Sequence, residues 1–554
     1  MLKVCPKETA SMLTRDGVRL DADIYRPDAE GEFPVLLMRQ PYGRSIASTV
    51  VYAHPAWYAK HGYIVAIQDV RGRGTSEGEF NLFVHEITDG FDAVNWAANL
   101  PESNGKVGMY GFSYQGMTQL YAASAKPNAL TTICPAMVGC DLYADWAYEG
   151  GAFCLQSNLG WAIQLAAETA RLKGDVSAYQ SLYAASRNLP LGDTIPARPE
   201  IMKHLAPNSY YHDWLENYRP GEYWEKLSPK IEDLDLPMLH IGGWFDTYLR
   251  GNLRLYKAMS ARGNFPQHSI VGPWAHLPWG RKVGAMDCGF AAANPVDELQ
   301  IRWFDRFLKG LDAGILDEPP ISLFEMGSNE WRKFDKWPEE NCQSYFLATN
   351  GLASMREDAG ILMRDCPDIC TEDIFVHDPW RPVPSLGGHA AFPAGSFERS
   401  SVDCRTDVLT YTSAPIIADL HLAGEIIVEI FCTADAPSFD LCAILSEVKN
   451  GSSVWNFTQG YVRVNSSENP VRIMLQPTCM KLAKGNALRL SLSAACFPAY
   501  DMNPGTGAPP GEARLIDAKI VTLTVSCGGN CPSQILLPTF AANSRSTLKP
   551  LLEL

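Results

Sequence analysis

Short apolar runs bounded by proline or glycine recur in the first part of the chain. Residues 35–38 and 63–67 form such runs, which are typical of strands buried on both faces of a parallel sheet. Segments with helical character lie at 53–61 and 86–99, and a further strand pattern follows at 105–110. The alternation of strand and helix predicts an α/β fold.

This alternation stops between residues 141 and 233, where aromatic and alanine-rich segments such as 161–170 have helical periodicity without intervening strands. Strand patterns resume at 237–242 and 267–272, and an amphipathic helix is predicted over 298–308. The pattern therefore indicates a helical insertion, or cap, within one α/β domain.

Beyond Gly310 the pattern changes to short strands separated by turn residues. Examples are residues 321–324, 426–431 and 488–492, and no long helical period occurs there. Such spacing is typical of an all-β sandwich. We therefore expect a separate C-terminal β domain.

Length and charge narrow the function classes. A chain of 554 residues and 61.1 kDa exceeds what one hydrophobic core supports, so several domains are expected. The net charge of -15 and the absence of a basic stripe argue against a nucleic-acid partner. No run of about 18 apolar residues and no secretion signal is found, so we expect a cytoplasmic protein without membrane contact.

The 15 cysteines are scattered, often within apolar runs, which favours reduced thiols. Two pairs, Cys366 with Cys370 and Cys527 with Cys531, have a Cys-x3-Cys spacing that zinc could use. Neither pair has a second pair or a histidine cluster beside it in the sequence. We expect no metal and no cofactor.

The strongest chemical motif is Gly111-Phe-Ser113-Tyr114-Gln115-Gly116, placed where a predicted strand meets a predicted helix. A nucleophile elbow occurs at such a junction, where a tight turn exposes the serine oxygen. The common form is Gly-x-Ser-x-Gly, whereas here the second glycine comes one position later. We predict Ser113 as the nucleophile.

Two further residues follow in the order that α/β-hydrolases use, acid before histidine. Asp246 comes just after the strand pattern that contains His240, and His276 comes just after the next one. Serine is a weak nucleophile until a histidine takes its proton, and a carboxylate fixes the tautomer of that histidine. Ser113, Asp246 and His276 are therefore the predicted triad.

Acyl transfer also needs donors for the oxyanion of the tetrahedral intermediate. The backbone N–H of the residue after the nucleophile, Tyr114, is one expected donor. The second comes from the loop after an early strand, where Tyr42 lies in Arg39-Gln-Pro-Tyr42-Gly. An alternative for Tyr42 is a packed aromatic side chain.

Two other features suggest competing chemistry. The segment Gly72-Arg-Gly74-Thr-Ser-Glu-Gly78 is rich in glycine, but its spacing differs from a phosphate-binding loop and no helix is predicted to open there. We interpret it, with Asp69, as a shaped loop beside the active site. His240 is an alternative base, although it lies within a strand pattern.

Together these motifs resemble the cocaine-esterase and X-Pro dipeptidyl-peptidase-related hydrolases, the CocE/NonD family. The resemblance spans nearly the whole chain. It rests on Arg39-Gln-Pro-Tyr42-Gly, Gln68-Asp-Val-Arg-Gly-Arg-Gly-Thr-Ser-Glu-Gly78, the elbow with its displaced glycine, Gly243-Trp-Phe-Asp246, Gly272-Pro-Trp-Ala-His276 and Trp303-Phe-Asp-Arg-Phe-Leu-Lys-Gly310.

The resemblance implies the same triad of Ser113, Asp246 and His276, and an oxyanion hole formed by the Tyr42 hydroxyl and the Tyr114 N–H. It also implies an α/β-hydrolase fold with an inserted helical cap and a C-terminal all-β jelly-roll. We expect the α/β-hydrolase domain in 1–140 and 235–317, the cap in 141–234 and the jelly-roll in 318–554.

The implied function is hydrolysis of ester or amide bonds through an acyl-enzyme, most simply as a carboxylesterase or acylase. X-Pro dipeptidyl-peptidase and α-amino-acid ester hydrolase activities are the alternatives. Enzymes with these activities recognise the free amine of the substrate through carboxylates. The sequence does not assign that role to Glu149, Glu168 or Asp175 of the cap. X-Pro peptidases of the family have an extra N-terminal helical domain, and this chain begins almost directly with strands, which favours the esterase. A catalytically silent binding protein is a third alternative.

The expected partner is a small-molecule ester, amide or short peptide. The natural substrate and the oligomeric state stay open, a homo-oligomer included.

Overall fold

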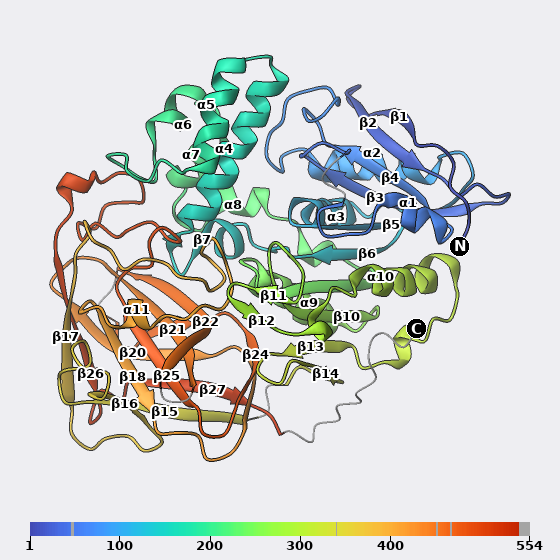
Figure 1. The fold of residues 1–554 in the computed structure, drawn as a ribbon. Helices are drawn as coiled ribbons and strands as arrows, with labels where there is room; N and C mark the ends of the chain where they lie inside the picture. Colours follow the sequence, from blue (N-terminus) through green and yellow to red (C-terminus); the bar gives the residue numbers. More distant parts are fainter. Residues whose placement is uncertain (46–48, 339–340, 450–451, 466–467, 542–554) are drawn as a thin grey trace.

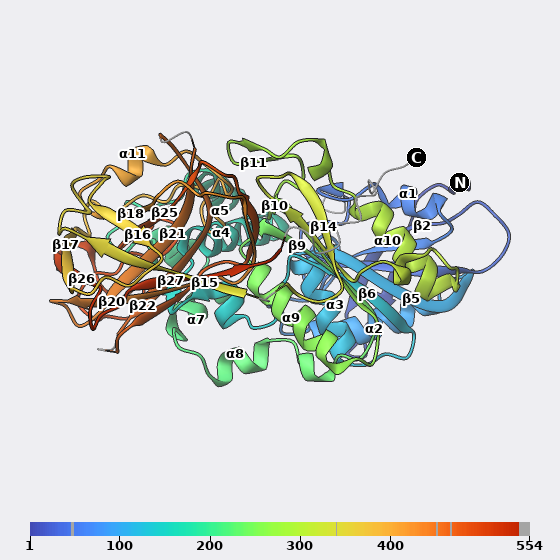
Figure 2. The same ribbon diagram turned by 90° about the horizontal axis from the view of Figure 1, so that it is seen from below.

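The structure is a computed structural model that describes residues 1–45, 49–338, 341–449, 452–465 and 468–541. Figure 1 shows three regions: an α/β part in blue and green on the right, a group of teal helices at the upper left, and a β-rich part in orange and red at the lower left. Seen from below in Figure 2, the β-rich part and the α/β part lie side by side along the long direction of the molecule.

A ten-stranded sheet forms the α/β part, in the order β1-β2-β4-β3-β5-β6-β9-β10-β13-β14. Its central strands run parallel, as their continuous apolar sequences predict. The strands are β1 (Glu8–Leu13), β2 (Arg19–Tyr25), β3 (Phe33–Gln40), β4 (Ile64–Asp69), β5 (Ser103–Phe112), β6 (Leu130–Ala136), β9 (Met238–Phe245), β10 (Gln267–Ala275), β13 (Ile321–Glu325) and β14 (Glu330–Phe334).

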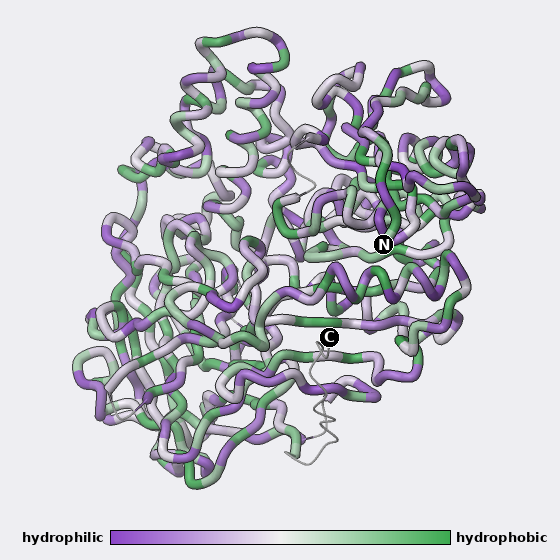
Figure 3. Tube along the Cα trace, turned by 45° about the vertical axis from the view of Figure 1, so that its right-hand side comes forward, coloured by the Kyte–Doolittle hydropathy of each residue, from purple (hydrophilic) through white to green (hydrophobic). Residues whose placement is uncertain are grey.

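Helices cover both faces of this sheet, so alternate residues of one strand enter different cores. Val35 and Leu37 of β3 pack in the cluster that holds α2 and α3, whereas Leu36 and Met38 pack against α1 and α10. Figure 3 shows helices in which hydrophilic and hydrophobic stretches alternate, as expected for elements with one buried face. The helices are α1 (Pro55–Lys60), α2 (Glu86–Ala98), α3 (Tyr114–Ser124), α9 (Leu249–Arg262) and α10 (Val296–Phe304).

The helical insertion lies between β6 and β9, where the sequence predicts it. A two-residue hairpin, β7 (Tyr148–Glu149) with β8 (Ala152–Phe153), precedes its helices, so the segment is not entirely without strands. The helices are α4 (Leu155–Leu172), α5 (Val176–Arg187), α6 (Glu200–Leu205), α7 (Tyr210–Glu216) and α8 (Glu222–Leu227).

The C-terminal part is built on a second, 13-stranded sheet system. Between β14 and the end of the described chain, α11 (Ser400–Asp403) is the one α-helix in the residues that the structure describes. The strands are β15 (Asn341–Thr349), β16 (Gly360–Met363), β17 (Thr371–His377), β18 (Val408–Ser413), β19 (Leu420–Gly424), β20 (Ile427–Ala434), β21 (Phe439–Lys449), β22 (Ser453–Val464), β23 (Val471–Met474), β24 (Thr478–Leu482), β25 (Ala487–Ser493), β26 (Val521–Cys527) and β27 (Gln534–Thr539).

One strand belongs to a different sheet than expected. We predicted residues 321–324 as the first strand of the C-terminal β domain, but β13 pairs in parallel with β10, with Ile270 opposite Ser322. The hairpin to β14 then ends the first sheet at Phe334. A short strand pattern alone cannot indicate its partner strand, because its apolar residues suit either sheet.

Within the described ranges, no helix combines the length and the apolar character needed to cross a bilayer. The structure pairs none of the 15 cysteines, all of which it describes, in a disulfide.

Candidate active site

Ser113 occupies the single residue between β5 and α3. Its backbone has φ 59° and ψ -127°, a conformation that costs a non-glycine residue energy and is held by the surrounding structure. The Ser113 N–H donates to the carbonyl of Ala136 on β6 at 3.0 Å. This is the geometry of a nucleophile elbow, at the carboxyl end of a central parallel strand.

The displaced glycine of the motif has a steric explanation. A Cβ at Gly116 would lie 2.3 Å from a methyl of Val138 and 2.8 Å from the Ala136 carbonyl oxygen. A Cβ at Gly111 would lie 2.5 Å from the Cβ of Gln115, and Gly111 has φ +139°. Close approach of β6 to the first turn of α3 therefore requires glycine at 116, while position 115 accepts a side chain.

Asp246 and His276 meet at the same edge of the sheet. They follow the neighbouring parallel strands β9 and β10, and His276 Nδ1 lies 2.7 Å from Asp246 Oδ1. The Asp246 side chain is fully buried, whereas that of His276 is 23% exposed, so one face of the imidazole stays accessible. Because Nδ1 is engaged by the carboxylate, Nε2 is the nitrogen left to exchange a proton with substrate groups.

The elbow lies against this pair. The ring of Phe112, the residue before Ser113, is 5.5 Å from the His276 ring between centroids, and Tyr248 contacts the same imidazole edge-on at 5.1 Å. The structure thus brings the three predicted triad residues to one place.

Tyr42 also lies at this place. Its hydroxyl interacts with the Ser113 hydroxyl and accepts a hydrogen bond from Trp161 Nε1, on α4 of the helical insertion, at 3.1 Å. Burial raises the pKa of Tyr42 to about 12, so the phenol keeps its proton at neutral pH. An indole N–H donates only, so the Tyr42 proton is free to point towards a substrate oxygen.

Tyr114 is held by a second, buried set of contacts. As the first residue of α3 its backbone N–H has no acceptor within the helix. Its hydroxyl donates to Glu86 Oε1 at 2.7 Å, and Arg39 donates to the other oxygen of Glu86 at 2.5 Å. Burial raises the pKa of Tyr114 well above its usual value, so this hydroxyl stays a donor to the carboxylate.

The C-terminal part contributes contacts that sequence patterns did not reveal. Gln476 Nε2 donates to the backbone oxygen of Asp246 at 2.6 Å, and Thr247 Oγ1 donates to the backbone oxygen of His389 at 2.8 Å. These bonds join residues 230 and 142 positions apart. No local motif marks such pairs, because a buried amide or hydroxyl is common in any β domain.

A buried ion cluster lies next to these contacts. Glu149 of β7 pairs with Arg250 at 2.7 Å and with His389 at 2.8 Å, and accepts from the Tyr500 hydroxyl at 2.6 Å. Burial alone would raise the pKa of Glu149, but Arg250 and His389 lower it to about 2. Glu149 therefore connects the insertion, α9 and the C-terminal part as a carboxylate.

The other acidic residues considered for amine recognition have partners too. Glu168 pairs with Arg171 on the same helix at 2.8 Å. Asp175 caps α5 by accepting from the Ala178 N–H at 3.0 Å. Neither carboxylate is placed by these contacts for substrate recognition.

His240 is a core histidine. It is fully buried within β9, its Nε2 lies 2.8 Å from Gln267 Oε1, and burial lowers its pKa to about 4. The alternative that His240 is the base loses support, because His276 has the carboxylate partner.

Arg73 is a buried cation in the glycine-rich loop. It is 1% exposed, stacks on the Phe80 ring at 3.8 Å and donates to the Leu165 carbonyl at 3.2 Å. Among the described residues it forms no ion pair with a carboxylate, and burial lowers its pKa to about 10.

The two Cys-x3-Cys turns lie side by side, since Gly529 N–H donates to the Pro367 carbonyl at 2.8 Å. Cys527 nevertheless points into the interior, where its Sγ is 3.9 Å from the Tyr411 hydroxyl, and Cys366 is exposed. In the part of the chain with assigned positions, no group of three or more His, Cys, Asp or Glu side chains is arranged to hold a metal ion.

Comparison with known proteins decides the family. Residues 16–278 match the model of the X-Pro dipeptidyl-peptidase (S15) family, and residues 313–536 match the X-Pro dipeptidyl-peptidase C-terminal non-catalytic domain. The chain is also 30% identical to a cocaine esterase of Rhodococcus sp. (strain MB1 Bresler), over 95% of this chain and 96% of that one. The chain belongs to the CocE/NonD family.

Membership of the CocE/NonD family makes the protein a serine hydrolase and confirms the resemblance seen in the sequence. Solved structures share the whole fold. An aminopeptidase from a marine-sediment Thaumarchaeota archaeon has a TM-score of 0.81 at 22% identity, covering 97% of this chain and 96% of that one. An α-amino-acid ester hydrolase has a TM-score of 0.78 at 22% identity, covering 97% of both chains.

Proposed function

We propose that this serine hydrolase is a carboxylesterase whose triad is Ser113, Asp246 and His276. The observation that supports it most is the 2.7 Å contact between Asp246 and His276 at the edge of the sheet where the elbow presents Ser113. Membership of a family with a cocaine esterase at 30% identity supports the choice of ester bonds.

In the acylation step, Ser113 Oγ attacks the carbonyl carbon of the ester while His276 Nε2 takes the serine proton. Asp246 stabilises the imidazolium that forms and keeps Nδ1 protonated. The tetrahedral intermediate then collapses, and the alkoxide leaves with the proton from His276. An acyl-enzyme on Ser113 results.

The negative charge of that intermediate develops on the former carbonyl oxygen. The Tyr42 hydroxyl and the Tyr114 N–H donate to it. Trp161 occupies a lone pair of the Tyr42 oxygen, and Glu86 holds the Tyr114 ring, so both donors are oriented before substrate binds. Water then attacks the acyl carbon, with His276 again as the base, and releases the acid.

The surroundings of the site favour esters without a recognised amine. Glu149, Glu168 and Asp175 each have a partner within the protein. Aromatic rings instead adjoin the site: Trp161 packs on Trp146 at 5.5 Å, and Trp146 stacks on Tyr248 at 4.0 Å. Such rings suit an apolar acyl group.

We also infer the finer architecture. Residues 141–234 form a cap over the site, which the Trp161 contact to Tyr42 supports. The part of the described chain that follows β14, beginning with β15, is a jelly-roll that steadies the loop carrying Asp246 through Gln476. Cytoplasmic residence stays a prediction.

Rates on p-nitrophenyl acetate and butyrate, compared with an Xaa-Pro p-nitroanilide, test the proposal, with Ser113→Ala as the control. An esterase should cleave both esters, leave the anilide nearly untouched and lose activity in the variant. Preferential cleavage of the anilide would replace the esterase by a dipeptidase, and ester cleavage by Ser113→Ala would remove the triad assignment.

A further inference from the structure

The glycine-rich segment after β4 touches the loop that holds Tyr42. β3 and β4 are parallel neighbours in which Gln40 lies opposite Asp69, so the loop after β3 and the loop after β4 start side by side. The first contains Tyr42, and the second contains Gly72, Gly74 and Thr75. The triad uses no residue of the second loop.

Asp69 binds both ends of the Tyr42 loop. Its Oδ1 accepts from Gln40 Nε2 at 3.0 Å and from the Arg44 backbone N–H at 2.7 Å, and its Oδ2 accepts from Arg44 Nη1 at 2.6 Å. Gln40 in turn accepts from the Tyr42 backbone N–H at 2.9 Å. One carboxylate is therefore bonded to the residues on either side of Tyr42.

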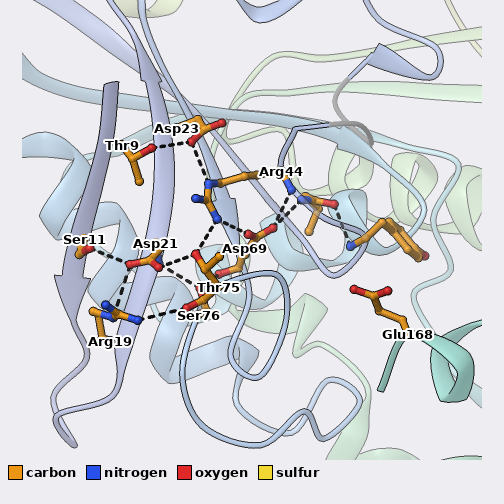
Figure 4. A network of polar contacts seen from close by, with 12 residues as sticks. Thr9, Ser11, Arg19, Asp21, Asp23, Arg44, Asp69, Thr75, Ser76 and Glu168 are labelled. Carbon is orange, nitrogen blue, oxygen red and sulfur yellow. Dashed lines mark hydrogen bonds and ion pairs between the residues drawn. The ribbon is translucent and has the colours of Figure 1, made fainter. Parts of the chain in front are cut away.

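Arg44 extends the network to the edge of the sheet. Its Nε donates to Asp23 Oδ1 at 2.8 Å and its Nη1 donates to Thr75 Oγ1 at 2.8 Å. Thr75 donates to Asp21 Oδ2 at 2.5 Å. Figure 4 shows Arg44 between Asp23, Asp69 and Thr75, and no dashed line joins Glu168 to this network.

The glycine at 74 makes room for the network. A Cβ there would lie 1.9 Å from Asp69 Oδ2 and 2.3 Å from its Cγ, and the residue has φ +58°. The second loop thus closes over the carboxylate and leaves Asp69 1% exposed. This contact, not phosphate binding, explains why a glycine stands at this place of the motif.

Burying the charges of Asp23, Asp69 and Arg44 costs solvation free energy. Asp69 and Asp23 are almost fully buried, and the Arg44 side chain is 15% exposed. Burial raises the pKa of Asp69 even though Arg44 bonds to it. Replacing a buried ion network by apolar packing of the same volume is often neutral or stabilising, so stability alone is a weak reason for this network.

We propose that Asp69 and Arg44 are positioning residues that hold the 40–44 loop so that the Tyr42 hydroxyl faces the oxyanion. The inference rests on the proposed role of Tyr42 in the oxyanion hole. Neither residue touches the substrate. Their effect on the reaction passes through Tyr42.

A double-mutant cycle of Asp69→Asn with Tyr42→Phe tests this, with kcat and KM measured on p-nitrophenyl acetate. Asp69→Asn turns an amide towards the Arg44 guanidinium and loosens the loop. We expect kcat to fall about 10- to 100-fold, the range for a misplaced catalytic group, with KM changed less than about threefold. In the Tyr42→Phe background the same substitution should change kcat less than about threefold, because the hydroxyl it positions is gone.

Asp89→Asn is the matched control. Asp89 is 2% exposed and accepts two bonds from Arg71 of the same glycine-rich loop, at 2.9 and 2.7 Å, and no hydrogen bond or ion pair joins it to residues 40–44. We expect it to lower the melting temperature about as much as Asp69→Asn does, while kcat stays within about twofold of wild type.

The outcomes separate the two claims. Full activity of Tyr42→Phe would overturn the oxyanion role and, with it, the inference. A low kcat in Tyr42→Phe with an unchanged kcat in Asp69→Asn, or with fully additive losses in the double variant, would overturn the positioning role alone. If Asp69→Asn does not fold, Arg44→Lys enters the same cycle, because lysine keeps the charge but lacks the planar fork that spans Asp23 and Asp69.

Discussion

Replacing Asp246 by asparagine tests how the histidine is held. The Asp246 carboxylate is fully buried and accepts from His276 Nδ1 at 2.7 Å. The backbone of Asp246 is fixed by Gln476 at 2.6 Å, so an asparagine should occupy the same position. The side-chain amide of the asparagine would then donate to His276 Nδ1 and stabilise the tautomer that has its proton on Nε2. In that tautomer Nε2 cannot accept the serine proton.

The magnitude follows from that tautomer change. In triads of this geometry the asparagine variant loses about 10⁴ in kcat. With about 1.36 kcal/mol for each factor of ten, this corresponds to roughly 5 kcal/mol of lost transition-state stabilisation. KM should change little, because Asp246 does not touch the substrate. Stability should not fall, since a buried charge is replaced by a neutral group of the same shape.

The assay is steady-state hydrolysis of p-nitrophenyl acetate, with thermal unfolding measured on the same preparations. Asp145→Asn is a suitable comparison, because Asp145 is also buried but pairs with Arg254, at 2.5 Å, rather than with a histidine. We expect near-wild-type kcat from that variant. An Asp246→Asn enzyme that keeps kcat within tenfold of wild type would refute the reasoning and show that His276 is oriented by another group.

Three further predictions concern single residues. Gln476→Leu removes the donor to the Asp246 carbonyl and should lower the free energy of unfolding by about 1–3 kcal/mol and lower kcat about tenfold. An unchanged kcat would show that the C-terminal part does not steady the loop that carries Asp246. Burial lowers the pKa of His240 to about 4, below the 6.5 of an exposed histidine, so its contribution to stability is present above pH 6.5 and is lost as the pH falls through 4. Over that range the free energy of unfolding, measured by denaturation at each pH, should fall by roughly 3 kcal/mol less in His240→Gln than in the wild type, and an equal fall in both proteins would contradict this. Arg73→Met removes a buried charge that has no carboxylate partner among the described residues, and it should raise the free energy of unfolding by about 1–3 kcal/mol. A lower free energy of unfolding, measured by denaturant titration, would indicate that Arg73 makes stabilising contacts beyond those with Phe80 and Leu165.

The position of the candidate site could be predicted because it depends on local patterns. Ser113, Asp246 and His276 each follow a continuous apolar run, and the carboxyl ends of parallel strands meet at one edge of a sheet. The sequence shows that the second glycine of the motif stands at position 116, but it does not show why a glycine is needed there. Only the structure shows β6 lying against that turn.

Long-range pairing could not be predicted in the same way. Residues 321–324 have the composition of a strand, yet nothing in them specifies β10 as the neighbour. Gln476 and Trp161 are likewise ordinary residues of a β domain and a helix. Their contacts with Asp246 and Tyr42 exist because three parts of the chain pack together, and that packing depends on surfaces that no short segment defines.

The glycine-rich loop falls between these cases. Its spacing differs from that of a phosphate-binding loop, and we expected a shaped loop beside the active site. The interaction of Asp69 with both ends of the Tyr42 loop required the register of β3 on β4, in which Gln40 lies opposite Asp69.

The central claim is that Ser113 is the nucleophile, and covalent labelling tests it most directly. The purified protein is treated with a fluorophosphonate, and the adduct is located by peptide mass spectrometry in the wild type, in Ser113→Ala and in His276→Ala. We expect one adduct per chain on Ser113, none in Ser113→Ala, and labelling slowed by orders of magnitude in His276→Ala, since the imidazole must take the serine proton. An adduct on another serine, or labelling of wild type and Ser113→Ala at equal rates, would contradict it.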